Sequence, residues 1–186
     1  LVTGGAGFIG SNYVHRLLAR GEKVAIYDNF SRGGAPRNLE WLKAEFGENA
    51  FDVIVGDVRD ASRITEAASK SDVIAHLAGQ VAVTTSITNP RDDFESNALG
   101  TFNVLEAARA SGRKPIVIYA STNKVYGGME EVELFEEPPR WRYKDLVNGC
   151  PETQPLDFHS PYGCSKGTGD QYVRDYARIY GLRSVV

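Results

Sequence analysis

The sequence predicts an α/β domain built on a doubly wound parallel sheet. Short apolar runs rich in β-branched residues alternate with segments of helical period, which indicates a parallel sheet covered on both faces. The predicted strands are Leu1–Thr3, Val24–Asp28, Asp52–Gly56, Val73–Ala78, Ile116–Ser121 and one that starts near Arg183. The predicted helices are Ser11–Ala19, Pro36–Phe46, Arg91–Ala110 and Pro161–Tyr180, and Ser62–Ser69 is predicted to be a short crossover.

Each helix is predicted from an apolar stripe and from the residues at its ends. In the first helix Val14, Leu17 and Leu18 share one face, and Gly21 is a typical stop signal. In the long helix Arg91–Ala110, apolar residues repeat every three and four positions. The last helix has a strong start signal, because Ser160 is a good N-cap and Pro161 occupies the first helical position.

The composition excludes several classes of protein. The 186 residues are 42% hydrophobic and 24% charged with a net charge of −3, which is ordinary for a globular domain. No run of lysine and arginine predicts nucleic-acid binding, and no apolar stretch is long enough to span a membrane. Cys150 and Cys164 lack the spacing of metal ligands, so we expect no metal site and a reducing, cytoplasmic location.

Both ends of the chain read as truncated. The first residues resemble the second half of a strand, the only methionine is Met129, and Ser184–Val186 reads as a strand that is just beginning. We therefore expect residues 1–186 to be one dinucleotide-binding domain whose C-terminal substrate-binding part lies outside this fragment. Residues 127–158 form a loop much longer than usual, inserted before the last helix, and are predicted to be functional or partly disordered.

A glycine-rich turn joins the first strand to the first helix. In the run Gly4–Gly10, Gly4 permits a tight turn, Gly7 allows close approach of a pyrophosphate, and Gly10 allows the helix to pack against the strand. The helix N-terminus then presents free N–H groups and the positive end of its dipole to the phosphates. A glycine pattern alone is compatible with a simple turn, but its place between a strand and a helix predicts dinucleotide binding.

An acidic residue follows at the spacing expected of a ribose ligand. Asp28 ends the second strand eighteen residues after Gly10. A carboxylate there repels a 2′-phosphate, so NAD is favoured over NADP. Arg32 is close enough in sequence to meet such a phosphate, although a solvated loop arginine is the simpler interpretation.

Tyr162 and Lys166 are the best candidates for proton transfer. Their i, i+4 spacing places both side chains on one face of the last helix. A free tyrosine has a pKa near 10, and a neighbouring ammonium group favours the phenolate that could act as a base. The alternative is an ordinary exposed helix, and the preceding glycine motif is what favours catalysis.

Hydroxyl groups also follow the fifth predicted strand. Ser121 and Thr122 lie at its carboxyl end, which is where open α/β sheets bind their ligands. Such a hydroxyl could bond the reacting oxygen of a substrate and share its proton with Tyr162. For Ser121, capping of backbone groups is an equally good interpretation.

Taken in order, these segments resemble the extended short-chain dehydrogenase/reductases, the NAD-dependent epimerase/dehydratase family. The resemblance is carried by Thr3–Gly10, Asp28, Gly56–Val58, His76–Ala78, Asn97, Ser121–Gly127 and Tyr162–Lys166. It implies a Rossmann fold that binds NAD, with Asn97 bracing an inner helix and with Thr122, Tyr162 and Lys166 as the catalytic trio. The residues it implies for cofactor binding are Gly4, Gly7, Phe8, Ile9, Asp28, Asn29, Asp57, Val58, Leu77, Ala78, Gly79, Tyr162 and Lys166.

Three strings favour one branch of this family. Residues 76–86, 121–127 and 156–163 resemble the CDP-tyvelose (CDP-paratose) 2-epimerases, and Asn123 and Lys124 stand where the 4,6-dehydratases carry an acidic pair. The resemblance implies epimerisation at C2 of CDP-paratose, through removal and return of a hydride and a keto intermediate. The residues expected to contact the substrate are Gln80, Thr84, Asn123 and Lys124.

Other functions remain open at this stage. A C4 epimerase or another oxidoreductase of a nucleotide sugar would use the same fold and trio. A non-catalytic NAD(P)-binding sensor is less consistent, because it would not require both Tyr162 and Lys166. The expected partner is a nucleotide-diphosphate sugar, with CDP-linked dideoxyhexose favoured, and the family resemblance implies a homo-oligomer formed through Arg91–Ala110 and Pro161–Tyr180.

Overall fold

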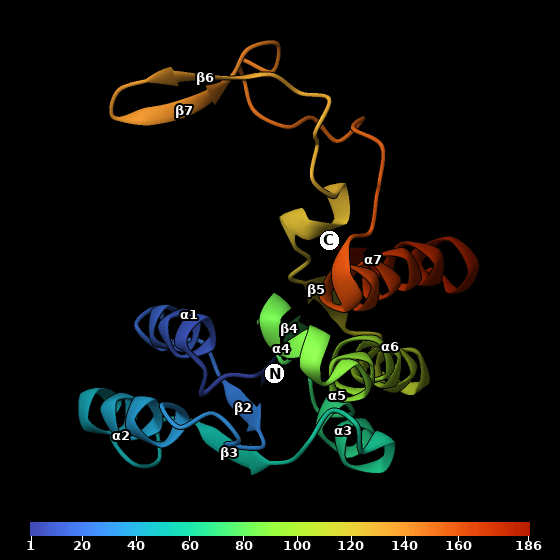
Figure 1. The fold of residues 1–186 in the computed structure, drawn as a ribbon. Coiled ribbons are helices and arrows are strands. Elements are labelled where there is room, and N and C mark those ends of the chain that lie inside the picture. Colours follow the sequence, from blue (N-terminus) through green and yellow to red (C-terminus); the bar gives the residue numbers. More distant parts are fainter.

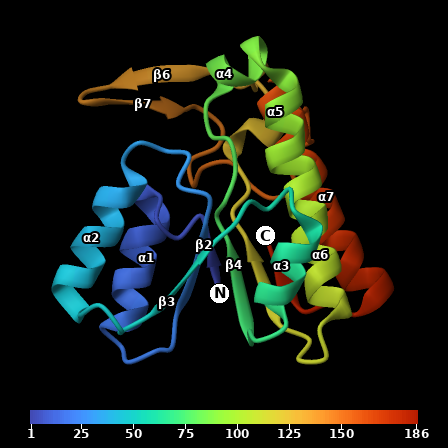
Figure 2. The same cartoon turned by 90° about the horizontal axis from the view of Figure 1, so that it is seen from below.

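The computed structural model describes residues 1–186, and its core is a six-stranded sheet with helices on both faces (Figures 1 and 2). The strand order is β3-β2-β1-β4-β5-β8, and every neighbouring pair is parallel. The order of the strands reverses between β1 and β4, so their carboxyl ends form the crevice where doubly wound sheets bind ligands. The strands of the sheet are β1 (Val2–Thr3), β2 (Ala25–Asp28), β3 (Asp52–Val55), β4 (Val73–His76), β5 (Ile116–Tyr119) and β8 (Ser184–Val185).

The two faces of the sheet carry separate cores, which confirms the doubly wound arrangement. Successive strand side chains point to opposite faces, so Ile26 belongs to one core and Tyr27 to the other. In Figure 2 one pair of helices lies on one side of the sheet and the remaining long helices lie on the other. The first pair is α1 (Phe8–Leu18) and α2 (Ala35–Phe46), and the second group contains α3 (Ala61–Ala68), α6 (Gly100–Ala110) and α7 (Ser160–Tyr180).

The long helix predicted for Arg91–Ala110 is helical throughout but not uniform. It consists of α5 (Pro90–Phe94), a π-helical turn η1 (Glu95–Leu99), and α6. The backbone angles at both joins stay in the right-handed helical region, so the axis continues through the wider turn. Hydrophobic spacing did not predict this turn, which is stabilised by polar side chains described below. Such π turns are frequent at functional sites.

The start of α7 differs by one residue from the prediction, because the helix begins at Ser160 and His159 takes the N-cap position without a side-chain bond. Ser160 has a φ of 67°, and its Oγ accepts a hydrogen bond of 3.2 Å from the N–H of Gly163. Gly181 ends the helix in the left-handed conformation. Neither this helix nor any other combines the length and apolar character of a membrane-spanning segment.

Two predictions of local structure were incomplete. Helix α1 begins at Phe8 rather than at Ser11, because the glycine-rich turn leads directly into the helix with Gly7 as its N-cap. Residues 127–158, predicted as an irregular loop, contain an antiparallel hairpin that extends away from the sheet (Figure 1). The hairpin escaped prediction because its first strand is exposed along its whole length and therefore has no alternating pattern. The additional elements are α4 (Val83–Thr88), η2 (Asn123–Tyr126), β6 (Leu134–Glu137) and β7 (Arg140–Tyr143).

Candidate active site

The glycine-rich turn brings the ends of β1 and β4 together. Gly4 has a φ of 67°, and a Cβ atom there would lie 2.7 Å from the backbone nitrogen of Ala78. A Cβ atom on Gly10 would overlap the carbonyl oxygen of Gly4. A Cβ atom on Gly7 would meet only that same carbonyl, at 3.1 Å, so the outer side of the turn is open. Gly4 and Gly10 are thus required by packing, whereas Gly7 leaves room for a ligand.

The open side of this turn is the N-terminus of α1. No side chain caps this end of the helix, and Phe8 and Ile9 are 82% and 68% exposed. Asp28 lies beside it, where its Oδ2 accepts the Ala6 N–H at 3.0 Å and its Oδ1 accepts the Phe30 N–H at 2.9 Å. These bonds fix the carboxylate against the glycine turn. The N-terminus of α1 therefore combines uncapped N–H groups with an open turn and a fixed carboxylate.

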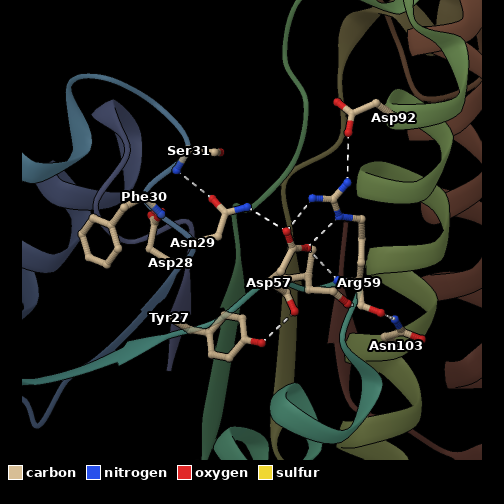
Figure 3. A network of polar contacts seen from close by, with 10 residues as sticks. Tyr27, Asp28, Asn29, Phe30, Ser31, Asp57, Arg59, Asp92 and Asn103 are labelled. Atoms are coloured by element: carbon tan, nitrogen blue, oxygen red, sulfur yellow. Dashed lines mark hydrogen bonds and ion pairs between the residues drawn. The ribbon is translucent and has the colours of Figure 1, made fainter.

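A polar network joins the end of β3 to the neighbouring helices (Figure 3). Asp57 accepts hydrogen bonds from Arg59 at 2.9 and 2.7 Å and from Asn29 at 2.8 Å. The bond from Arg59 lowers the pKa of Asp57 to about 2. Arg59 also pairs with Asp92 on α5 at 3.0 Å. Because the carboxylate of Asp57 is already bonded within the chain, it fixes the loop that carries Val58. Contact of Asp57 and Val58 with a cofactor stays a prediction.

His76 lies in a buried chain of hydrogen bonds with a single consistent direction. The Ala78 N–H donates to Thr3 Oγ1 at 3.2 Å, and Thr3 Oγ1 lies 2.7 Å from His76 Nδ1. On the other side of the ring, Nε2 lies 3.1 Å from Thr101 Oγ1, which itself donates to the Asn97 carbonyl at 2.6 Å. The hydroxyl of Thr101 therefore accepts a hydrogen bond from Nε2–H of the ring. Because burial lowers the pKa of His76, the imidazole is neutral and Nδ1 accepts from Thr3.

This arrangement predicts a fold that weakens in mild acid. Burial lowers the pKa of His76 from 6.5 to about 3. Below pH 6.5 the unfolded chain therefore binds a proton that the folded chain does not bind. We expect His76 to remove about 2 kcal/mol of folding free energy between pH 6.5 and pH 5. Urea unfolding at the two pH values measures this loss, and the variant His76→Gln should show a smaller one. Equal losses in both proteins would contradict the neutral, buried state of His76.

A second buried network links the loop after β4 to α7. Asp93 is fully buried and accepts hydrogen bonds from Gln80 Nε2 at 3.0 Å, from Asn97 Nδ2 at 3.1 Å and from Ser165 Oγ at 2.5 Å. Asn97 also exchanges hydrogen bonds with the backbone of Gln80, at 2.9 and 3.1 Å. The π-helical turn that contains Asn97 therefore connects β4 to α7. Gln80 uses its amide inside the protein, and its predicted contact with a sugar remains a prediction.

Tyr162 and Lys166 lie one turn apart near the start of α7. The backbone N–H of Tyr162 donates to Ser86 Oγ at 3.1 Å, which fixes this end of the helix against α4. Lys166 is buried, donates to the Ala120 carbonyl at 2.6 Å and lies 4.2 Å from the centre of the Tyr119 ring. Burial lowers the pKa of Lys166 to about 8. The ammonium group is thus held at the end of β5, one helical turn from the position of Tyr162.

Thr122, the third residue of the predicted trio, lies three residues after the end of β5. It caps η2, because its Oγ1 accepts the N–H of Lys124 at 3.3 Å. Ser121, in contrast, donates to Asp170 on α7 at 2.8 Å. Its hydroxyl therefore has an internal partner, whereas Thr122 is partly exposed beside η2. Three of the four residues predicted to contact the substrate have exposed side chains near this edge: Thr84, Asn123 and Lys124.

Sequence reasoning missed several residues that support the site. Asp93 and Ser165 gave no signal, because their partners lie on elements distant in the sequence. Asp170 did have a signal. It lies four residues after Lys166 and eight after Tyr162, so helical spacing alone places the three on one face.

Comparison with known proteins identifies the family. The profile described as GDP-mannose 4,6 dehydratase matches residues 1–186. The chain is 50% identical to a CDP-paratose 2-epimerase from Salmonella typhi, over 100% of this chain and 55% of that protein. It is 31% identical to a dTDP-glucose 4,6-dehydratase from Mycolicibacterium smegmatis, over 100% of this chain and 51% of that protein. The chain therefore belongs to the GDP-mannose 4,6-dehydratase family of extended short-chain dehydrogenase/reductases, and spans about half the length of these relatives.

Solved structures agree with this assignment. A double mutant of the dTDP-glucose 4,6-dehydratase DesIV from Streptomyces venezuelae, with NAD bound, superposes with a TM-score of 0.81 at 32% identity, over 98% of this chain and 52% of that one. The UDP-glucose 4-epimerase from Thermus thermophilus, in complex with NAD, gives a TM-score of 0.75 at 35% identity, over 98% and 52%. Both likenesses confirm the Rossmann-type fold.

Proposed function

We propose that this chain is the NAD-binding part of a nucleotide-sugar epimerase that inverts C2 of CDP-paratose to give CDP-tyvelose. The observation that carries the proposal is that the start of α7, which carries Tyr162 and Lys166, packs against η2, which Thr122 caps, at the carboxyl end of β5. The open glycine turn lies at the same edge of the sheet, at the end of β1. The 50% identity to a CDP-paratose 2-epimerase over the whole chain supports the choice of substrate.

The residues at the switch point fit NAD. The uncapped N-terminus of α1 would bind the pyrophosphate through the backbone at Gly7, Phe8 and Ile9, beside the turn at Gly4. Asp28 and Asn29 would bind the adenosine ribose, and Asp28 would repel the extra phosphate of NADP. The remaining cofactor contacts in the proposal follow β3 and β4: Asp57, Val58, Leu77, Ala78 and Gly79.

Tyr162, Thr122 and Lys166 would have separate roles in the oxidation and reduction of the sugar. Tyr162, as phenolate, would take the proton from the sugar hydroxyl, and Thr122 would orient that hydroxyl by a hydrogen bond. Lys166 would stabilise the phenolate by its charge and bind the nicotinamide ribose. NAD, when bound, supplies reversible storage of one hydride. The keto-sugar would then present its other face, and Tyr162 would return the proton to the oxygen.

Dehydration is not favoured by the same site. Elimination of water requires an acid and a base beside the trio, and the two residues after Thr122 are the exposed Asn123 and Lys124. Simple removal and return of a hydride needs neither. A C4 epimerase or another nucleotide-sugar oxidoreductase would share this geometry, so the substrate must be tested directly.

Proton NMR of the full-length protein mixed with CDP-paratose, without added cofactor, tests the proposal. We expect CDP-tyvelose to appear while no NADH accumulates, because a tightly held cofactor is regenerated in each turnover. Steady release of NADH would instead indicate a net dehydrogenase. No turnover, with NAD recovered from the denatured protein, would discard the substrate, and a screen of other nucleotide sugars would follow.

The domain limits, assembly and location belong to the same proposal. We treat residues 1–186 as the NAD-binding domain, with contacts to base and sugar supplied largely by the remainder of the protein. Aromatic side chains on the outer helices support a homo-oligomer, since Phe94 and Tyr180 are 57% and 55% exposed on α5 and α7. Sedimentation of the full-length protein tests the oligomer.

The free cysteines Cys150 and Cys164 agree with a cytoplasmic location, which stays a prediction.

A further inference from the structure

Lys166 is a buried cation whose direct partner is uncharged. Its ammonium group donates to the carbonyl of Ala120 and lies over the ring of Tyr119, and the residue is only 8% exposed. Burying an ammonium group without a nearby negative charge favours its neutral form. A neutral amine could not stabilise a phenolate on Tyr162. Some other group must therefore help to keep the proton on Lys166.

The groups that face Lys166 come from four elements. His76 on β4 is neutral, and Tyr119 on β5 contributes the face of its ring. Tyr162 lies one turn before it on α7. The two carboxylates whose charges act on the ammonium group are Asp170 on α7, which has the larger effect, and Asp93 on α5. Both carboxylates accept hydrogen bonds from other residues: Asp93 from three donors, and Asp170 from Ser121 at 2.8 Å and from Gln171 Nε2 at 3.3 Å. Asp170 lies one turn after Lys166 on the same helix, and it is therefore the stronger candidate for the counter-charge.

Asp170 also belongs to a set of contacts that align β5 with α7. The hydroxyl of Tyr119 donates to the Lys166 carbonyl at 3.0 Å, and Lys166 Nζ donates to the Ala120 carbonyl at 2.6 Å. The next residue, Ser121, donates to Asp170 Oδ2 at 2.8 Å. Three consecutive residues are thus bonded to α7 immediately before Thr122. Asp170 makes the last of these bonds, one turn beyond Lys166.

We propose that Asp170 is a positioning residue of the active site, which supplies the counter-charge of Lys166 and anchors Ser121 so that Thr122 faces Tyr162. The catalytic consequence rests on the function proposed above. The effect on Lys166 does not, because it is a property of this chain alone. Asp170 would touch neither the substrate nor the cofactor, and it acts through Lys166 and Ser121.

Two substitutions separate the charge from the hydrogen bond. Asp170→Asn removes the charge but keeps an amide oxygen that can accept from Ser121, whereas Ser121→Ala removes the bond and keeps the charge. Asp175→Asn is the matched control, since Asp175 is exposed on the same helix. Circular dichroism and thermal melting establish that each variant is folded before any other comparison.

The first readout is the protonation of Lys166 in this chain, with neither cofactor nor substrate. In protein labelled with ¹³C-lysine, the Cε signal of Lys166 is assigned by its loss in Lys166→Met and followed against pH. We expect the midpoint to fall by roughly one pH unit in Asp170→Asn and to stay unchanged in Ser121→Ala and Asp175→Asn. An unchanged midpoint in Asp170→Asn would overturn the counter-charge.

The second readout is epimerisation by the full-length enzyme. Asp170→Asn should move the alkaline limb of the kcat profile to lower pH by the same amount as the NMR midpoint. Ser121→Ala should lower kcat roughly tenfold without moving that limb. An unchanged kcat in Ser121→Ala would overturn the anchoring role. If the wild-type enzyme does not act on CDP-paratose, the proposed function fails while the NMR result still decides the role of Asp170.

Discussion

Replacing Tyr162 by phenylalanine is expected to lower the turnover of CDP-paratose by about 10²- to 10⁴-fold, the usual contribution of a positioned acid–base group. The substitution removes only the hydroxyl. Within the chain, Tyr162 is held through its backbone, whose N–H donates to Ser86. The helix and the glycine turn should therefore keep their structure, and NAD should remain bound.

The measurement compares turnover with the amount of NAD recovered from the denatured enzyme. Tyr180→Phe is the matched control, because Tyr180 lies at the far end of the same helix and is 55% exposed. That variant should keep full activity. An active Tyr162→Phe enzyme would show that Tyr162 does not transfer the proton, and the assignment of the trio would then be wrong. Loss of NAD together with activity would indicate a structural defect instead.

The sequence predicts the parts of this molecule that depend on neighbouring residues. The glycine motif could be interpreted because the strand, turn and helix around Gly4–Gly10 are consecutive, and each glycine has a local steric reason. The face shared by Tyr162 and Lys166 follows from helical spacing alone. The parallel sheet followed from the alternation of strands and helices, since parallel strands need such crossovers.

What could not be predicted depends on contacts between distant segments. Nothing near Gln80 indicates that its amide would be bonded to Asp93, because Asp93 is buried only when α5 packs against α7. The hairpin of β6 and β7 is held by strand pairing: all of β6 is exposed, and β7 alternates arginine with aromatic residues over only four positions, a run too short to predict a strand. For Ser121 the sequence is compatible with both catalysis and capping. Its hydroxyl donates to Asp170, a contact between segments 49 residues apart that the sequence does not predict.

The second large effect concerns Lys166, which we expect to be essential for activity and costly to the fold. Its pKa falls from 10.5 to about 8 on burial, which corresponds to about 3 kcal/mol of lost stability at neutral pH. In Lys166→Met this loss disappears, while the carbonyl of Ala120 loses its donor at a cost of about 1–2 kcal/mol. The variant should therefore be about 1–2 kcal/mol more stable than the wild type without cofactor, and its turnover should fall by about 10²-fold or more.

The pH dependence of this difference distinguishes charge burial from better packing. Below about pH 8 the proton is bound in both the folded and unfolded chains, so the advantage of Lys166→Met is constant. Between about pH 8 and 10.5 the unfolded chain keeps the proton that the folded wild type has released, so wild-type stability rises relative to the variant. Urea unfolding at pH 7 and pH 10 should show the advantage shrinking, with the exposed Lys23→Met giving no such change. An advantage that stayed constant across this range would mean that methionine stabilises by packing, and that Lys166 carries no electrostatic strain.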